Sequence, residues 1–285
     1  MLEPLQFEFF QRAIVAALLA SVACGVVGTY VVVKRIASVS GGLSHAAFGG
    51  VGLSYWLGIE PMLGAAVFAV GCASGLGVLE RRLHSGLDTL IAMVWAAGMA
   101  VGIIFVSLTP GYAPQLMSYL FGSILFVPST YLVFAAALDV VVLAAVLVLF
   151  REFEAVAFDE EFADVAGLPV AALVQGMLVL IALAIVVLIR VVGVILVIAL
   201  LTVPAATARQ WSSSLARMMT LSSILGAVCS VAGLYVSYWL SDGLDARVPA
   251  GPLIILLAVA MYAASGVVHR FAYRPLSRRA ASTAK

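Results

Sequence analysis

The sequence from Val170 to Ala208 reads VAALVQGMLVLIALAIVVLIRVVGVILVIALLTVPAATA and contains one charged residue, Arg190. A stretch this long with so little charge is stable where the surrounding solvent is hydrocarbon. A single helix over these residues would be about 58 Å long, far longer than the apolar core of a bilayer is thick. We therefore expect two membrane-spanning helices, joined on the outer face by a tight turn near Arg190 and Gly193.

The same scarcity of charge recurs along most of the chain. Hydrophobic residues make up 64% of the 285 residues and charged residues 10%, too few to build a water-facing surface. Because backbone polar groups find no water in lipid, each apolar run is expected to be a helix. The runs are residues 13–33, 43–59, 61–79, 89–109, 129–150, 170–189, 191–208, 220–240 and 251–269. The fold class is thus an all-α polytopic membrane protein, one domain over residues 1–285 with about eight or nine transmembrane helices.

Two segments are less regular than the rest. The run 43–59 is short and rich in glycine, so we expect a tilted or broken helix buried against its neighbours. The segment Pro110–Pro128, PGYAPQLMSYLFGSILFVP, is too rich in proline and glycine for a full span. We interpret residues 110–128 as an external segment with a short re-entrant or interfacial helix, whose aromatic residues suit the level of the lipid headgroups.

The positions of lysine and arginine predict the orientation in the membrane. Twelve of the 15 can share one side, and three fall on the other. The twelve are Lys34, Arg35, Arg81, Arg82, Arg151, Arg209, Arg217, Arg270, Arg274, Arg278, Arg279 and Lys285, and the three are Arg12, Arg190 and Arg247. Since cytoplasmic loops are enriched in these residues, we expect a cytoplasmic C-terminal tail over residues 270–285. Nine spans would place the N-terminus outside, and eight would place it inside.

Two ionisable side chains lie within apolar runs. On a helix, His45 shares a face with Gly41, Gly49 and Gly52, which would let another backbone approach or leave volume beside the imidazole. His45 is a candidate for a metal or proton pathway, and the alternative is a hydrogen bond to a neighbouring helix. Asp139 must face a polar interior or be protonated, with a structural hydrogen bond or contact with the substrate as its two possible roles.

Two polar segments are candidate contact surfaces on the cytoplasmic side. Residues Phe158–Gly167, FDEEFADVAG, place their apolar side chains on one side of a short amphipathic helix, closed by Gly167 and Pro169. Residues Arg209–Met219, RQWSSSLARMM, have the length and mixed polarity of a helix lying across the membrane face. Either segment could instead be a solvated loop.

The chain lacks several familiar motifs. It contains no Gly-x-x-x-x-Gly-Lys-Ser/Thr loop to cradle nucleotide phosphates and no His-Glu-x-x-His pair of zinc proteases. It also lacks the arginine ladder of a voltage sensor and the signature of a selectivity filter. An intramembrane enzyme would need paired ionisable groups, which are almost absent. Transport by a non-enzymatic membrane protein is therefore the favoured class, with no nucleic-acid partner expected.

With these residues in hand, the chain resembles the permease subunits of bacterial ABC importers for zinc, manganese and iron(II). The resemblance runs from about Ala13 to His269, and six segments match the family in order. They are Leu43-Ser44-His45-Ala46 with Gly49 and Gly50, Asp88-Thr89 with Gly98-Met99-Ala100, Leu120–Leu125 (LFGSIL), Phe158–Ala163 (FDEEFA), Leu200–Ala208 (LLTVPAATA) and Pro249-Ala250-Gly251. Each is weak alone, but six in the right order are specific.

The resemblance implies a permease bundle of the type II ABC-importer kind in a bacterial inner membrane. It implies a homodimer, two cytoplasmic ATPase subunits, a periplasmic or extracellular metal-binding protein, and no permanently bound cofactor. The transported ion would be zinc first, then manganese or iron. The segment 209–219 would be the coupling helix that docks on the ATPase, through Arg209, Ser213, Leu215 and Arg217. The cytoplasmic signature would comprise Phe158, Asp159, Glu160, Glu161 and Phe162.

One position departs from the family pattern. Many members carry Asp four residues before the histidine that matches His45, where this chain has Gly41. A hard carboxylate ligand is thereby lost, although one imidazole from each of two subunits could still form a transient two-nitrogen site. Three alternatives remain: an ABC permease for a metal chelate or vitamin, a secondary transporter coupled to an ion gradient through Asp139 and His45, and a structural membrane protein.

Overall fold

The computed structural model describes residues 3–83, 86–110, 124–244 and 248–282, and within these ranges all regular structure is helical. This agrees with the all-α class expected for a chain whose backbone must satisfy its own hydrogen bonds in lipid. The elements are η1 (Glu3–Gln6), α1 (Glu8–Val33), α2 (Ala37–Leu57), α3 (Pro61–Leu83), α4 (Leu87–Leu108), η2 (Ile124–Phe126), α6 (Ser129–Val148), α7 (Phe150–Phe158), α8 (Glu160–Val165), α9 (Val170–Val192), α10 (Val194–Trp211), α11 (Leu215–Leu244) and α12 (Ala250–Ser282).

Eight of the described helices are long and apolar enough to cross a bilayer: α1, α3, α4, α6, α9, α10, α11 and α12. The polytopic fold class is thereby confirmed. The run 43–59, which the sequence counted as a span, belongs to α2 and is not among these eight. α2 has 21 residues, enough to span, but its glycines and serines lower its hydropathy.

α2 nevertheless connects opposite ends of the molecule. It follows Lys34, whose ammonium reaches Val156 in α7, and it precedes Glu60, whose carboxylate accepts a hydrogen bond of 3.5 Å from the Tyr131 hydroxyl in α6. α6 runs from near Tyr131 to the start of α7, so these contacts mark its two ends. α2 therefore traverses the same depth as its neighbours and is shielded by α3, α4 and α9.

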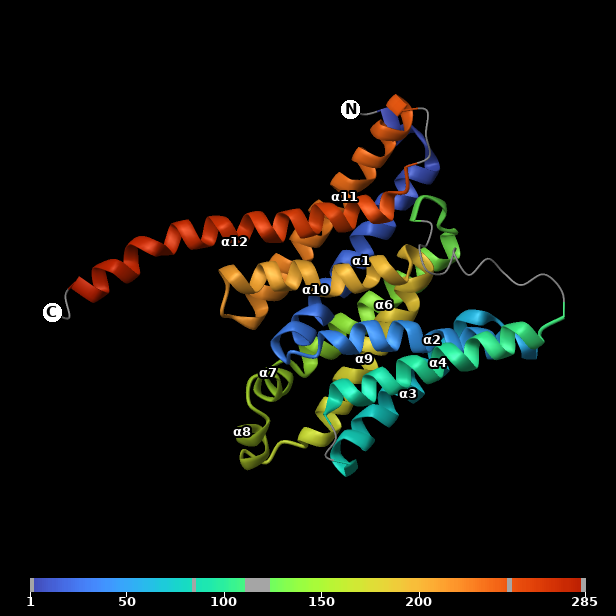
Figure 1. Ribbon diagram of the computed structural model, residues 1–285, viewed down its shortest axis with the longest axis horizontal. Helices are drawn as coiled ribbons and strands as arrows, with labels where there is room; N and C mark the ends of the chain where they lie inside the picture. Colours follow the sequence, from blue (N-terminus) through green and yellow to red (C-terminus); the bar gives the residue numbers. More distant parts are fainter. Residues whose placement is uncertain (1–2, 84–85, 111–123, 245–247, 283–285) are drawn as a thin grey trace.

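α1 occupies the middle of the bundle, where it packs against α6, α9, α10 and α11 (Figure 1). Glycine permits its closest contacts. A Cβ atom at Gly25 would lie 2.2 Å from the Ser223 hydroxyl in α11, and one at Gly28 would lie 2.0 Å from the Leu201 carbonyl oxygen in α10. Small residues at such crossings let helix backbones approach closely, which gives dispersion contacts in the absence of a hydrophobic driving force. Figure 1 also shows α2, α3 and α4 grouped together at one side.

The turn expected near Arg190 and Gly193 is confirmed. α9 ends at Val192, α10 begins at Val194, and the intervening Gly193 has a φ of +89°, a conformation in which glycine avoids the steric cost of a Cβ atom. The long apolar stretch is thus two helices, each close to the length of a bilayer core.

The separate helix expected over residues 209–219 is absent. α10 continues to Trp211, Ser212–Ser214 form a short break, and α11 starts at Leu215. The mixed polarity that suggested a surface helix belongs instead to the last turn of one long helix and the first turn of the next. Among the described residues, segment 209–219 therefore contains a break between two long helices and not a helix of its own.

Two other boundaries differ from the expectation or lie outside it. The tail expected from residue 270 is helical to Ser282, because α12 extends through it with alanine and arginine, which favour helix. Of the segment 110–128, residues 111–123 lie outside the described ranges, including most of the LFGSIL match, and Ile124–Phe126 form the 3₁₀ turn η2.

Candidate functional site

His45 lies on the least buried stripe of α2, one turn after Gly41. Its imidazole stacks on the indole of Trp95 in α4, with ring centroids 4.7 Å apart and planes inclined by 9°. No hydrogen bond from either ring nitrogen is found within the described part of the chain, so the alternative role of His45, a hydrogen bond to a neighbouring helix, is not observed there. The stacking fixes the plane of the ring and leaves its two nitrogens at the edge, where they could meet an ion.

A small cavity of about 100 Å³ adjoins His45 between α2, α3, α4 and the junction of α9 with α10. Apolar side chains form most of its wall, and the polar residues along it are Ser44, His45 and Arg190. The cavity has room for a few water molecules, but no carboxylate lines it. Within the described ranges, no cluster of three His, Cys, Asp or Glu side chains could hold a metal ion. One imidazole in a largely apolar wall therefore offers few ligands to an ion.

The three glycines expected on the face of His45 differ in how closely a neighbouring helix packs against them. A Cβ atom at Gly49 would lie 2.9 Å from the Gly98 carbonyl oxygen, and one at Gly52 would lie 2.3 Å from the Gly102 carbonyl oxygen, so both permit close packing of α2 on α4. Gly41 does not pack in this way, because a Cβ atom there would meet nothing within 4 Å. The space beside Gly41 is open.

Asp139 lies away from His45. It is buried in α6 beside Ala23 and Cys24 of α1, and its Oδ1 atom lacks a hydrogen-bond partner among the described residues. Asp139 does not line the cavity beside His45. The structure therefore does not bring the two intramembrane candidates together in one site.

The signature residues form a corner at the end of the molecule where α1 and α10 finish. Asp159 caps α8, its Oδ1 accepting a hydrogen bond of 2.9 Å from the Phe162 backbone N–H. Gly167, with a φ of +82°, follows the end of α8 as expected. Phe158, Phe162 and Val165 are exposed, as are Glu160 and Glu161. Phe158 ends α7, and Phe162 and Val165 lie on α8, so the exposed apolar side chains gather around one corner, as is typical of a contact surface.

The second segment, residues 209–219, lies beside this corner. Arg209 donates a hydrogen bond of 2.8 Å to the Val32 carbonyl oxygen at the end of α1, Leu215 is buried, and Ser213 and Arg217 are exposed. An open cavity of about 860 Å³ is lined both by Phe158 and by residues of this segment, among them Arg209, Ser213 and Leu215. The two candidate contact segments thus border one hollow, which the sequence could not show.

Two residues that matter here were missed as site residues. Trp95 stacks on His45, and Lys34 contacts α7 and α8. Lys34 was counted only as a marker of orientation, although a lysine at the end of an apolar run can also reach a helix terminus. Trp95 carries no local signal, because the pairing depends on how α2 packs on α4.

Comparison with known proteins identifies the family of this chain. The model of the ABC 3 transport family matches residues 6–269. The chain belongs to this family. As a member it is the membrane-spanning permease of a transport system, and it is not an enzyme.

Relatives match the permease over most of its length. An uncharacterized membrane protein of Synechocystis sp. is 42% identical over 92% of this chain and 91% of its own. The manganese transport system membrane protein of Listeria monocytogenes is 33% identical over 82% of this chain and 83% of its own. Among solved structures, PsaBC from Streptococcus pneumoniae in complex with Fab superposes with a TM-score of 0.80, at 31% identity and 93% coverage of both chains.

Proposed function

We propose that this permease is the membrane-spanning subunit of an ATP-driven importer for a divalent first-row metal ion. The family match over residues 6–269 carries the proposal. The sequence contains no phosphate-binding loop, so ATP hydrolysis would take place in separate subunits. An external binding protein would deliver the ion, as the family resemblance implies.

Manganese is the first candidate cargo, followed by zinc and iron(II). The name of the Listeria relative supports manganese. The chemistry beside His45 keeps zinc and iron(II) in consideration, because imidazole suits these ions and manganese prefers oxygen ligands. The absence of a carboxylate from the adjoining cavity fits a site through which ions pass without being held.

A second copy of the permease would complete the route. One chain supplies one imidazole to the His45 region, and both His45 and Trp95 remain partly exposed. Two copies facing each other would place two imidazoles along one passage. That arrangement would form a weak two-nitrogen site, from which an ion can be released.

The end that carries α7, α8 and the corner between α10 and α11 would face the cytoplasm, where lysine and arginine are enriched. The C-terminus would then be cytoplasmic in the inner membrane. The ATPase would contact the exposed apolar side chains of the α7–α8 corner, which are Phe158 at the end of α7 and Phe162 and Val165 on α8, together with the corner at residues 209–217. Phe158, Phe162 and Val165 supply apolar area to this surface, and Ser213 and Arg217 supply exposed polar side chains.

Reconstitution tests this function. The permease, its ATPase and its binding protein are placed in liposomes, and uptake of Mn²⁺, Zn²⁺ and Fe²⁺ is measured with and without ATP. ATP-dependent uptake of a free ion is expected. Uptake of a chelate alone would favour the chelate or vitamin permease, and uptake without the ATPase, driven by an ion gradient, would favour a secondary transporter.

His45→Ala tests the proposed route in the same liposomes. We expect uptake to fall while the amount of assembled transporter is unchanged, because the variant removes the only imidazole that borders the described cavity. Unchanged uptake at equal assembly would remove His45 from the route.

A further inference from the structure

The last turn of α1 is tied to both contact segments. Its end is a Schellman motif, in which the Ile36 N–H donates to the Val31 carbonyl at 3.0 Å and the Arg35 N–H donates to the Val32 carbonyl at 3.3 Å. The Val32 carbonyl also accepts the hydrogen bond from Arg209 at the end of α10. The corner between α10 and α11 is therefore attached directly to the end of α1.

Arg35 gives this joint an unusual backbone. Its φ of +58° makes it the only non-glycine residue with a positive φ in the described part of the chain. A left-handed conformation costs a residue with a Cβ atom roughly 1–2 kcal/mol, so surrounding contacts must hold it in place. α2, which carries His45, begins two residues later at Ala37. Any rotation at Arg35 would therefore tilt α2.

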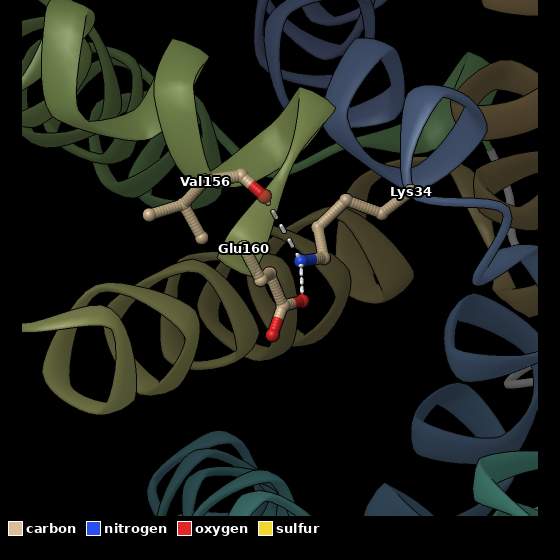
Figure 2. Close-up of polar contacts among 3 residues, drawn as sticks. All are labelled: Lys34, Val156 and Glu160. Atoms are coloured by element: carbon tan, nitrogen blue, oxygen red, sulfur yellow. Dashed lines mark hydrogen bonds and ion pairs between the residues drawn. The ribbon is translucent and has the colours of Figure 1, made fainter. Parts of the chain in front are cut away.

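Lys34 links the same joint to α7 and α8 (Figure 2). Its ammonium donates a hydrogen bond of 3.4 Å to the Val156 carbonyl oxygen and forms an ion pair with the Glu160 carboxylate. The Lys34 side chain is only 11% exposed, while the Glu160 side chain is 52% exposed. Lys34 is thus largely withdrawn from solvent, and its two contacts come from a region more than 120 residues away in sequence.

The two contacts of Lys34 hold the corner between α7 and α8. The Val156 carbonyl lies in the last turn of α7, where helix carbonyls lack partners within the helix and the helix dipole favours a cation. Glu160 is the first residue of α8. One ammonium therefore bridges the last turn of α7 and the first residue of α8.

We propose that Lys34 is a positioning residue that transmits movement of α8 through the α1–α2 joint to α2 and His45. This inference rests on the proposed function, in which an ATPase contacts α8. A displacement of α8 would move Lys34 through its contacts with Glu160 and Val156. It would then pass through Arg35 into α2, the helix that stacks its histidine on Trp95. Each step of the path is a hydrogen bond, an ion pair or a continuous stretch of backbone.

The experiment measures metal ions imported per ATP hydrolysed by the complete transporter in liposomes. Lys34→Met removes both contacts, Glu160→Gln removes the ion pair, and Lys34→Arg keeps a cation at the same place. The matched control is Arg12→Met, which breaks the exposed ion pair of Arg12 with Glu8 near the opposite end of α1. Assembly with the ATPase is measured for every variant.

We expect Lys34→Met to lower the number of ions per ATP by about fivefold, the lower end of typical coupling effects, while ATP hydrolysis continues. Glu160→Gln should cause a smaller loss, and Lys34→Arg and Arg12→Met should behave as the wild type. A purely structural role would reduce import and hydrolysis together and leave their ratio unchanged. If Lys34→Met does not assemble, Glu160→Gln, on a half-exposed side chain, still tests the ratio.

Two failures can be told apart. Suppose the wild type imports metal with ATP, and Glu160→Gln and Lys34→Met import as many metal ions per ATP hydrolysed. The inference about Lys34 is then overturned and the proposed function stands. If the wild type shows no ATP-dependent import, the proposed function itself fails.

Discussion

The imidazole of His45 and the indole of Trp95 lie parallel, with ring centroids 4.7 Å apart. An offset stack of aromatic rings contributes about 0.5–1.5 kcal/mol beyond the area it buries, enough to hold the histidine in one orientation. Because α2 and α4 pack tightly through Gly49 and Gly52, the two rings are fixed relative to each other by backbone as well as by side-chain contacts. The orientation of His45 therefore depends on a residue that binds no ion.

Trp95→Ala should reduce metal uptake by roughly threefold to tenfold, the range that loss of one aromatic stack allows. The reason is that the imidazole would sample other rotamers and meet the ion less often. Trp95→Phe keeps an aromatic face and should retain most of the uptake. Initial uptake rates at equal amounts of transporter provide the measurement. Equal rates for Trp95→Ala and the wild type would show that the stack does not orient His45 for transport.

Phe162→Ala should weaken binding of the ATPase by about tenfold, because an exposed aromatic anchor at an interface is worth 1–2 kcal/mol or more. Phe162 is 67% exposed on α8, and Phe271 is 68% exposed on α12, which makes Phe271→Ala a matched control. Titration of the purified permease with its ATPase gives both affinities. If Phe271→Ala weakens binding as much as Phe162→Ala does, the α7–α8 corner is not the docking surface.

The extent to which sequence anticipates this structure varies from one feature to another. The break at Gly193 could be predicted because one continuous helix over these residues would be far longer than the apolar core of a bilayer is thick. The stop at Gly167 could be predicted because its signal is local. The helix expected from Phe158 begins only at Glu160, because Asp159 is extended and caps α8. The segment 209–219 was interpreted wrongly as a separate helix, because a helix end and a surface helix have the same mixed polarity.

The contacts that define the candidate site are not local. Lys34 meets Glu160 and His45 meets Trp95 only after distant helices have packed, so no pattern of neighbouring residues reveals either pair. Gly41, Gly49 and Gly52 share a face in sequence, yet only the last two pack closely against α4. α4 extends past Gly41, because the Ser38 hydroxyl donates a hydrogen bond to the Asp88 carboxylate and a Cβ atom at Gly42 would meet Ile91. Gly41 therefore differs because it faces away from α4.

Gly50→Ala should destabilise the permease by about 2 kcal/mol, the typical cost of inserting a methyl group where no space exists. Its Cβ atom would lie 2.1 Å from the Gly64 carbonyl oxygen, which belongs to the backbone of α3 and cannot move aside easily. Gly41→Ala is the control, since its Cβ atom meets nothing within 4 Å, and it should leave the melting temperature unchanged or slightly higher. The measurement is the melting temperature of each variant and of the wild type in detergent. Equal melting temperatures would show that α2 and α3 are not in tight contact.

Gly41→Asp should lower the KM for manganese uptake by up to about tenfold, equivalent to ~1.4 kcal/mol of added binding. The space beside Gly41 can accept the side chain, and the new carboxylate would lie one helical turn from His45. Oxygen ligands suit manganese better than imidazole alone, so the gain should be larger for Mn²⁺ than for Zn²⁺. Gly41→Asn, which has the same shape without the charge, separates a ligand effect from a packing effect. If neither variant changes the KM for any ion, the open face of α2 does not border the path of the metal, and the passage must be sought elsewhere in the bundle.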